Sequence, residues 1–196
     1  MTTESNGRER WLLAGQDLLR RGGVGEVKLQ ALTAELGLTT GSFYHHFTAM
    51  ADYLDQLARY YGSDQVLQHI ERIATDDPRE RIRRLAAVSR DERMGPLDAA
   101  MRDWAGANAL AAEAVARADE ILLRYLEQAF RDLGFDQRDA QLRALLLFST
   151  GVARIHPPWR PAVRSIDDVL DVLAPADAPA ATRQTRSVGR SGKPSA

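Results

Sequence analysis

A short polar stretch near the N-terminus carries the side chains best suited to recognition chemistry. Thr40, Ser42, Tyr44 and His45 bring three hydroxyls and an imidazole close together in the sequence. Threonine and serine hydroxyls can read base edges in a major groove, whereas a tyrosine hydroxyl, an imidazole and the N–H groups of a helix N-terminus suit phosphate oxygens. The alternative is a plain helix connection whose polar side chains face solvent.

Groups for catalysis or metal binding are scattered along the chain. The four histidines, His45, His46, His69 and His156, form no His-Glu-x-x-His motif, and none stands three residues after a glutamate. The sequence also lacks a glycine-rich phosphate loop, a nucleophile elbow and cysteine. We therefore expect no enzyme, no metal and no cofactor, with His69 on the surface.

The composition indicates a folded cytoplasmic protein. With 196 residues, 44% of them hydrophobic, the chain can bury a sizeable core. The absence of cysteine suits a reducing compartment. No apolar run approaches the roughly 20 residues of a membrane helix, and the N-terminus is too polar for a signal peptide. We expect a soluble protein that does not interact with membranes.

The charge excludes a nucleic-acid binder that depends on overall basicity. The formal net charge is -1, and residues 1–50 contain five basic and five acidic side chains. A small local footprint on DNA remains compatible with these numbers.

Helical periodicity throughout, with no alternating strand pattern, predicts an all-α fold. Asn6 and Glu9 have the spacing of a capping box for a first helix, which Gly22-Gly23 ends. A second helix is expected at about 28–36, and Gly37 is placed to end it in a left-handed conformation.

A third helix is expected to begin after Thr39, whose hydroxyl can accept a backbone N–H at the N-cap. Phe43 and Phe47 are four residues apart and point inward, together with Leu38. The polar side chains between them therefore face outward, as a helix-turn-helix reader of DNA requires.

The remaining sequence predicts a helical body. A helix from Met50 to about Ile73 is expected to bend at Gly62-Ser63, and the next helix starts at Asp77-Pro78. We expect Gly95-Pro96 to separate that helix from one at 97–104. Further helices are expected at about 108–133, 140–155 and 166–173. Together these patterns predict about nine helices.

We divide the chain into three parts on these patterns. Residues 1–48 form a helix-turn-helix DNA-binding head, and 49–175 form a helical ligand-binding and dimerisation body. Residues 176–196 lack periodicity and are rich in Ala, Pro, Ser, Arg and Gly, which predicts a disordered tail.

The head resembles the N-terminal domain of TetR/AcrR-family transcriptional regulators over about residues 8–54. The similarity lies in the turn glycine, the cap hydroxyl, the inner glycine and the Tyr-x-His-Phe ending, which all fall in register. These features occur in Leu32-Thr33-Ala34-Glu35-Leu36-Gly37-Leu38-Thr39-Thr40-Gly41-Ser42-Phe43-Tyr44-His45-His46-Phe47. The body resembles the family only in helix number, helix lengths and its two C-terminal helices.

The resemblance implies a three-helix head whose recognition helix covers about 40–47. The positions that touch double-stranded DNA in the family are occupied here by Thr39, Thr40, Ser42, Tyr44, His45 and His46. Lys28 replaces the usual capping threonine, so its ammonium can still contact a phosphate but the cap is lost. Met50 replaces a usual lysine, which predicts weaker DNA binding with a flatter salt dependence.

A homodimer is expected because one recognition helix reads only a few base pairs. The helix at 140–155 has an excess of apolar side chains, which favours an interface with a second copy. The alternative is a central core helix of a monomer. The candidate interface residues are Leu142, Leu145, Phe148, Val152, Ile166, Val169, Leu170 and Leu173.

The resemblance further implies a cavity for an unidentified small-molecule effector among the middle helices. Aromatic candidates for its lining are Trp104, Tyr125, Phe130 and Phe148, with plain core packing as the alternative. The implied function is a dimeric one-component regulator, more often a repressor, that a ligand releases from a palindromic operator. The second hypothesis is an all-helical ligand- or partner-binding protein whose DNA binding has weakened.

Overall fold

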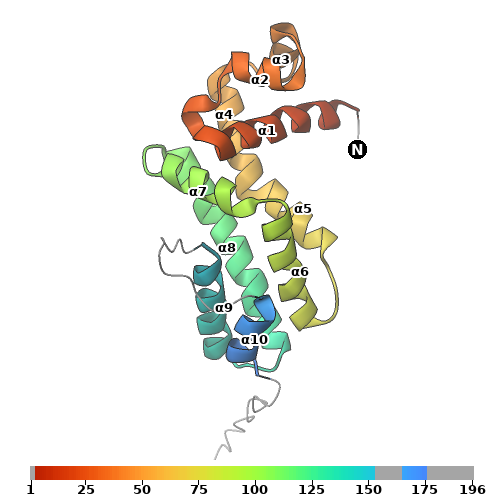
Figure 1. The fold of residues 1–196 in the computed structure, drawn as a ribbon, viewed down its shortest axis with the longest axis vertical. Coiled ribbons are helices and arrows are strands. Elements are labelled where there is room, and N and C mark those ends of the chain that lie inside the picture. The colour runs from red at the N-terminus through yellow and green to blue at the C-terminus, as the bar shows by residue number, and fades with distance from the viewer. Residues whose placement is uncertain (1–2, 153–164, 176–196) are drawn as a thin grey trace, which may run out of the picture.

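The computed structural model describes residues 3–152 and 165–175, and every regular element in these ranges is helical (Figure 1). The all-α prediction is therefore confirmed. The predicted helix end at Ile155 and the predicted tail at 176–196 lie outside the described residues. The helices are α1 (Thr3–Gly22), α2 (Leu29–Leu36), α3 (Thr40–His46), α4 (Met50–Arg59), α5 (Gln65–Arg72), α6 (Pro78–Asp91), α7 (Met94–Ala105), α8 (Ala109–Asp132), α9 (Gln137–Val152) and α10 (Ile166–Leu173).

Two short turns complete the described elements. A 3-10 turn, η1 (Val24–Glu26), follows α1, and a π turn, η2 (Tyr60–Asp64), joins α4 directly to α5. Counted as one bent helix, α4, η2 and α5 bring the number of helices in the described ranges to nine, as expected. None of these helices combines the length and apolar content of a membrane span.

An aromatic cluster holds the head together. Trp11 and Phe43 meet edge to face with ring centroids 5.4 Å apart, and the rings of Phe47 and Tyr53 lie 4.9 Å apart. All four side chains are buried. A helix as short as α3 is marginal alone in water, so this packing fixes it on α1 and α4.

The start of α1 differs from the prediction. The helix begins at Thr3, so positions 6 and 9 both lie inside it and position 6 is not its N-cap. Glu9 instead accepts a hydrogen bond from the Tyr60 hydroxyl, 2.8 Å away. The capping box was predicted from residue spacing alone. In the structure Glu9 contacts Tyr60, which is distant in the sequence, and this contact gives Glu9 a different role.

The bend predicted at Gly62-Ser63 is the π turn η2. A Cβ added to Gly62 would lie 2.8 Å from the Cα of Ala114, so α8 approaches the backbone of η2 directly. Only glycine permits this contact without displacing one of the helices.

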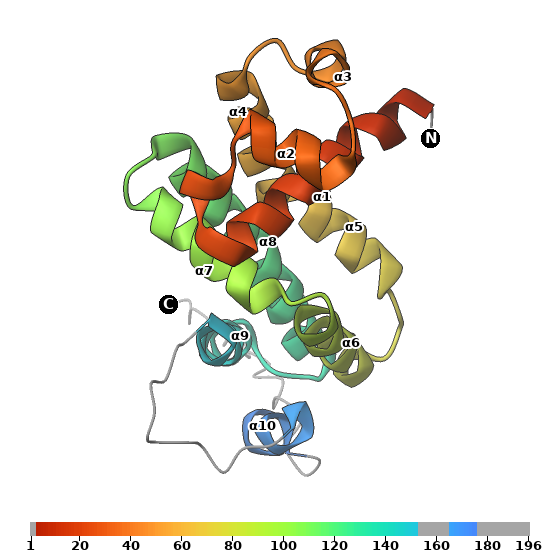
Figure 2. The same ribbon diagram turned by 45° about the horizontal axis from the view of Figure 1, so that its top comes forward.

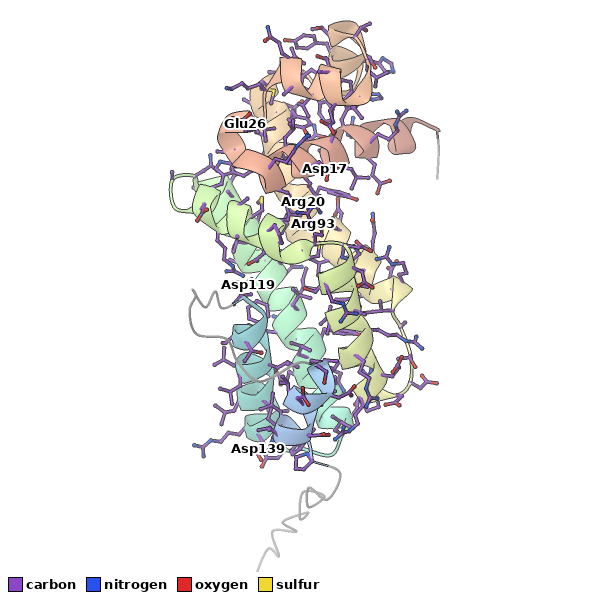
Figure 3. The ribbon with its side chains drawn as sticks, viewed as in Figure 1. Asp17, Arg20, Glu26, Arg93, Asp119 and Asp139 are labelled. Carbon is purple, nitrogen blue, oxygen red and sulfur yellow. The ribbon has the colours of Figure 1, made fainter. Side chains whose placement is uncertain are left out.

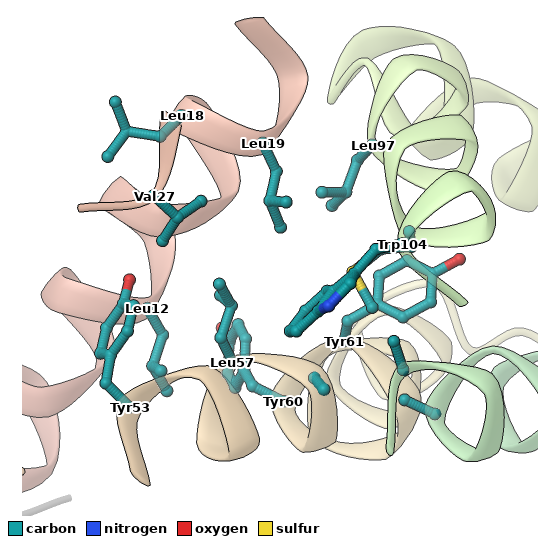
Figure 4. Packing of buried hydrophobic residues seen from close by; sticks show 14 of the residues in the cluster. Leu12, Leu18, Leu19, Val27, Tyr53, Leu57, Tyr60, Tyr61, Leu97 and Trp104 are labelled. Atoms are coloured by element: carbon teal, nitrogen blue, oxygen red, sulfur yellow. The ribbon is translucent and has the colours of Figure 1, made fainter. Parts of the chain in front are cut away.

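The head is joined to the body without a break in packing. Figure 4 shows buried side chains of α1, α4, η2 and α7 in one cluster, which also includes residues of α8. The amides of Gln16 and Gln65 exchange two hydrogen bonds of 2.9 Å in the buried interior. The Tyr61 hydroxyl donates to Asp98, 2.8 Å away. The glutamine pair links α1 to α5 across the expected boundary between 48 and 49, and the Tyr61–Asp98 contact links η2 to α7 within the body.

A second cluster forms the far end of the body, where α10 packs against α6 and α9 (Figures 1 and 2). Its buried members include Ile82, Leu126, Phe130 and Leu170. The expected helix starts hold here, because the Asp77 side chain caps α6 and the Asn108 side chain caps α8.

The separation expected at Gly95-Pro96 is wrong. These residues belong to the first turn of α7, where proline is tolerated because its missing N–H has no partner in the helix. The chain turns two residues before Gly95, at Arg93. Arg93 has a φ of 53° and is the single described non-glycine residue with positive φ.

Candidate nucleic-acid interface and internal cavity

The turn before α3 is built as its sequence predicts. Gly37 ends α2 with a φ of 64°, in the left-handed region. Thr39 is the N-cap of α3, and its Oγ1 accepts a hydrogen bond from the backbone N–H of Ser42 at 3.3 Å. Phe43 and Phe47 are fully buried, which fixes the rotation of α3 on the head.

This rotation turns the polar side chains of α3 outward. Tyr44 is 54% exposed, Thr39, Thr40 and His45 are exposed as well, and Ser42 is half-buried. In Figures 1 and 2, α3 lies at the end of the molecule opposite α9 and α10. A row of hydroxyl and imidazole groups therefore stands on a short helix at one end of the protein.

The two departures in the head have structural consequences. Lys28 is the exposed N-cap of α2, and its side chain makes no capping hydrogen bond. Met50 is the first residue of α4, whose N-cap Ala49 has no side-chain cap either. The lost cap at α2 therefore agrees with the sequence analysis.

Asp52, on α4 directly after the head, is a charged residue that sequence reasoning missed. It accepts hydrogen bonds from the Thr48 backbone N–H at 2.8 Å and from the Gln56 amide at 2.8 Å. The hydrogen bonds from Gln56 and Thr48 lower the pKa of its carboxyl. The four-residue spacing of Thr48 and Asp52 was the available signal. A carboxylate thus occupies the first turn of α4, where it repels phosphate.

Arg8 and His46 bring the start of α1 close to the end of α3. The exposed Arg8 guanidinium lies 6.0 Å from the Phe47 ring centroid. A Cβ on Gly7 would lie 3.1 Å from the half-buried His46 imidazole. Arg8 is therefore a further cation beside α3, contributed by a helix that the motif does not cover.

A cavity of about 1140 Å³ lies within the body and reaches the head. Residues from α1, η2, α5, α6, α7, α8, α9 and α10 line it. Its wall between α6, α8 and α9 is apolar and includes Ile82, Leu122, Leu126, Leu147 and Phe148. The volume exceeds that of typical drug-sized ligand sites.

Of the four aromatic side chains predicted to line a ligand cavity, one lines this cavity. Phe148 lines the cavity, but Trp104, Tyr125 and Phe130 do not. Trp104 packs in the cluster between head and body, and Phe130 is fully buried in the second cluster. Tyr125 is half-buried, and its hydroxyl is buried without a hydrogen-bond partner among the described residues. Aromatic residues at helical spacing serve here mainly as core.

His69 is not the surface residue that we expected. Its side chain is only 12% exposed, lines the cavity, and places Nε2 2.7 Å from Oε2 of Glu92. Arg72 also contacts Glu92. Burial lowers the pKa of His69 and outweighs the opposing effect of the Glu92 carboxylate.

The described residues contain no cluster of His, Cys, Asp and Glu that could hold a metal ion.

The residues predicted for a dimer interface divide into two groups. On α9, Leu142 and Leu145 are 50% and 51% exposed, and Leu146 beside them is 55% exposed.

On α10, Leu170 is fully buried in the second cluster, so its assignment to the interface is wrong. Burial between α10 and its neighbours in the same chain leaves it no surface for a partner. The half-buried Phe148, Ile166, Val169 and Leu173 pack against the same cluster, while Val152 is half-buried at the end of α9.

Comparison with known proteins finds similarity to solved structures but not to protein-family models or curated sequences. No protein-family model and no curated protein matches the chain. A transcriptional regulator from Rhodococcus sp. Rha1 is similar with a TM-score of 0.57 and 19% identity, over 74% of this chain and 79% of that one. A protein of unknown function from Rhodococcus sp. RHA1 has a TM-score of 0.50 and 24% identity, over 74% and 78%. At these identities the similarity establishes a shared helical fold.

Proposed function

We propose that the protein is a transcriptional regulator of the TetR/AcrR type that binds double-stranded DNA through α3. The observation that carries the proposal is the capped helix α3, whose buried phenylalanines turn Thr40, Tyr44 and His45 toward solvent. The fold shared with a Rhodococcus transcriptional regulator supports it. Such a protein acts in the cytoplasm, and the proposal assigns it no catalytic step and no cofactor.

The proposal includes a homodimer. A twofold dimer presents two recognition helices about 34 Å apart, which matches successive major-groove turns of a palindromic operator. The exposed leucines of α9, Leu142, Leu145 and Leu146, offer an apolar face for the second copy.

The proposal also includes repression that a small molecule relieves. The cavity extends from the apolar wall of the body to Leu19 and Arg20 of α1, so a bound ligand contacts both the body and the head. A ligand that favours one placement of α1 over another changes the separation of the two recognition helices and releases the operator.

Gel retardation of the DNA around the coding region tests DNA recognition. We expect a sequence-selective complex that Tyr44→Ala weakens at least about tenfold, the size of a lost charge-assisted phosphate contact. Leu67→Ala is a matched control, because Leu67 is similarly exposed but lies on α5. Equal binding of specific and random duplexes over a salt series would contradict the proposal.

The second candidate is an all-helical ligand- or partner-binding protein with weakened DNA binding. Met50 and the carboxylate of Asp52 in the first turn of α4 favour it, because neither attracts a phosphate. This candidate predicts saturable ligand binding together with no selective retardation of any duplex drawn from a random-sequence pool.

A further inference from the structure

The cavity has two chemically different ends. Ile82, Leu126 and Leu147 form part of its apolar wall and belong to the second cluster, at the end of the body near α10. Arg20 and Arg93 line the end that meets the head. Figure 3 shows both arginines where α1 passes over the start of α7. An elongated occupant would therefore meet hydrocarbon at one end and guanidinium groups at the other.

Arg20 keeps unused hydrogen-bonding capacity inside this site. Its side chain is 14% exposed, and Nη1 donates to Asp17 at 2.8 Å. Its Nε is buried and has no hydrogen-bond partner within the described ranges. A buried N–H donor without an acceptor is costly, so the guanidinium of Arg20 is not fully satisfied by its contacts within the described residues.

Arg93 supplies a solvent-exposed positive charge. It lines the cavity, and no carboxylate of the described residues pairs with it. Its φ of 53° costs conformational energy for a non-glycine residue, a feature that concentrates at functional sites. The first turn of α7 follows without a side-chain cap, so its N–H groups add positive potential.

The acidic side chains of the lining do not cancel this potential. Asp98 accepts hydrogen bonds from Tyr61 and from Arg102, so its charge is already compensated. Asp103 stands ten positions after Arg93, about 15 Å further along the α7 axis, and is exposed.

The remaining basic lining residues are already paired. Arg21 pairs with Glu35 at 2.5 Å, and Arg90 pairs with Asp91 at 3.1 Å. Arg20 is likewise paired, with Asp17 at 2.8 Å, so Arg93 supplies the unpaired positive charge that makes this end of the cavity electropositive.

We infer that the cavity binds an amphipathic organic carboxylate. Its carboxylate lies between Arg20 and Arg93, and its hydrocarbon body lies along the wall of α6, α8 and α9. Arg20 belongs to α1 and Arg93 to the junction of α6 with α7, so the anion connects the head helix to the body. The regulatory consequence rests on the proposed function, whereas the ligand class rests on the cavity alone.

Isothermal titration calorimetry of the full chain tests the ligand class. The probes are decanoate, decanol and decylamine below micelle formation, which share one chain and differ in charge. A second pair of probes, 2-naphthoate and 2-naphthol, has a rigid aromatic hydrocarbon portion in place of the flexible chain. We expect saturable binding in which at least one anion binds about tenfold or more tightly than its uncharged counterpart.

Variants of the two arginines test the site. Arg93→Asn removes the charge and suits the left-handed backbone, since asparagine tolerates positive φ. It should weaken binding of the preferred anion about tenfold and leave binding of the uncharged counterpart unchanged. Arg20→Gln should do the same, and if it fails to fold, Arg93→Asn alone decides. Arg117→Asn, on the exposed surface of α8 outside the cavity, should have no effect.

Three results would overturn the inference. They are equal binding of anions and uncharged counterparts, tighter binding of decylamine, and unchanged anion binding by Arg93→Asn. Gel retardation with the same preparations separates this inference from the proposed function. If the anion binds in a way that depends on Arg93 but does not change the DNA complex, the inferred ligand class stands and the proposed regulatory role is contradicted.

Discussion

Neither of two side chains at the start of α4, next to the head, offers a positive charge to DNA. Met50 contributes no charge, and Asp52 holds a carboxylate in the first turn, bonded to Thr48 and Gln56. Lys28 and Arg8 are exposed cations near the short helices, whereas the exposed Arg21 is paired with Glu35 of α2. DNA affinity is therefore expected to depend on few phosphate contacts.

Met50→Lys should strengthen operator binding. One new phosphate contact per subunit steepens the plot of log affinity against log salt by about 0.9, or about 1.8 for a dimer. Filter binding over a salt series measures the slope. Val172→Lys adds the same charge on α10, at the opposite end of the molecule, and should leave the slope unchanged. Equal effects of both variants would show that α4 does not approach DNA.

His69 should make the fold sensitive to acid. Burial lowers its pKa below the 6.5 of an unfolded chain, so the unfolded state binds the proton more readily. The stability contribution of neutral His69 is complete above about pH 6.5 and declines as the pH falls below it. Thermal unfolding at pH 7.5 and 5.5 should show a smaller loss of Tm for His69→Gln than for the wild type. His45→Gln, which changes an exposed histidine, serves as the control.

At the scale of elements, the π turn η2 links three helices. Tyr60 bonds to α1, Tyr61 bonds to α7, and Gly62 contacts the backbone of α8. A regular helix would rotate these side chains differently, because a π turn inserts one extra residue. The turn therefore sets how the head and the body are joined.

Gly62→Ala should destabilise the protein by about 1–3 kcal/mol, as overpacking against a rigid backbone does. Urea unfolding measures the change. Gly95→Ala makes the same chemical change in the first turn of α7, where no atom lies within 4 Å of the added methyl. It should leave stability unchanged or raise it by up to about 1 kcal/mol. A neutral Gly62→Ala would mean that α8 can withdraw from η2.

At the scale of the whole molecule, the exposed leucines of α9 concern assembly. Leu142, Leu145 and Leu146 lie on a helix whose other face packs on the body. Leu145→Glu should convert a dimer into monomers in sedimentation velocity, because a charge in an apolar interface lacks a partner.

The same variant should lose most operator affinity, since each subunit then binds alone. Leu110→Glu, which changes a similarly exposed leucine on α8, should remain dimeric. A wild-type chain that sediments as a monomer would reject the dimer at once.

Local interactions explain what the sequence predicted. The Gly37 end of α2, the Thr39 cap and the inward pair Phe43 and Phe47 each involve residues within four positions of one another. The Asp77 and Asn108 caps are equally local. The sequence alone therefore determined the helices, the turn before α3 and the outward side chains of the head.

Tertiary structure alone decided which side chains meet between helices. Helical periodicity shows that Trp104, Phe130 and Leu170 point inward, but it does not distinguish core, cavity and interface. The burial of His69 and the convergence of Arg20 with Arg93 on one cavity likewise depend on how distant helices pack. The physical reason is that such contacts join residues far apart in the chain, and the pattern within one helix carries no information about the surface that covers it.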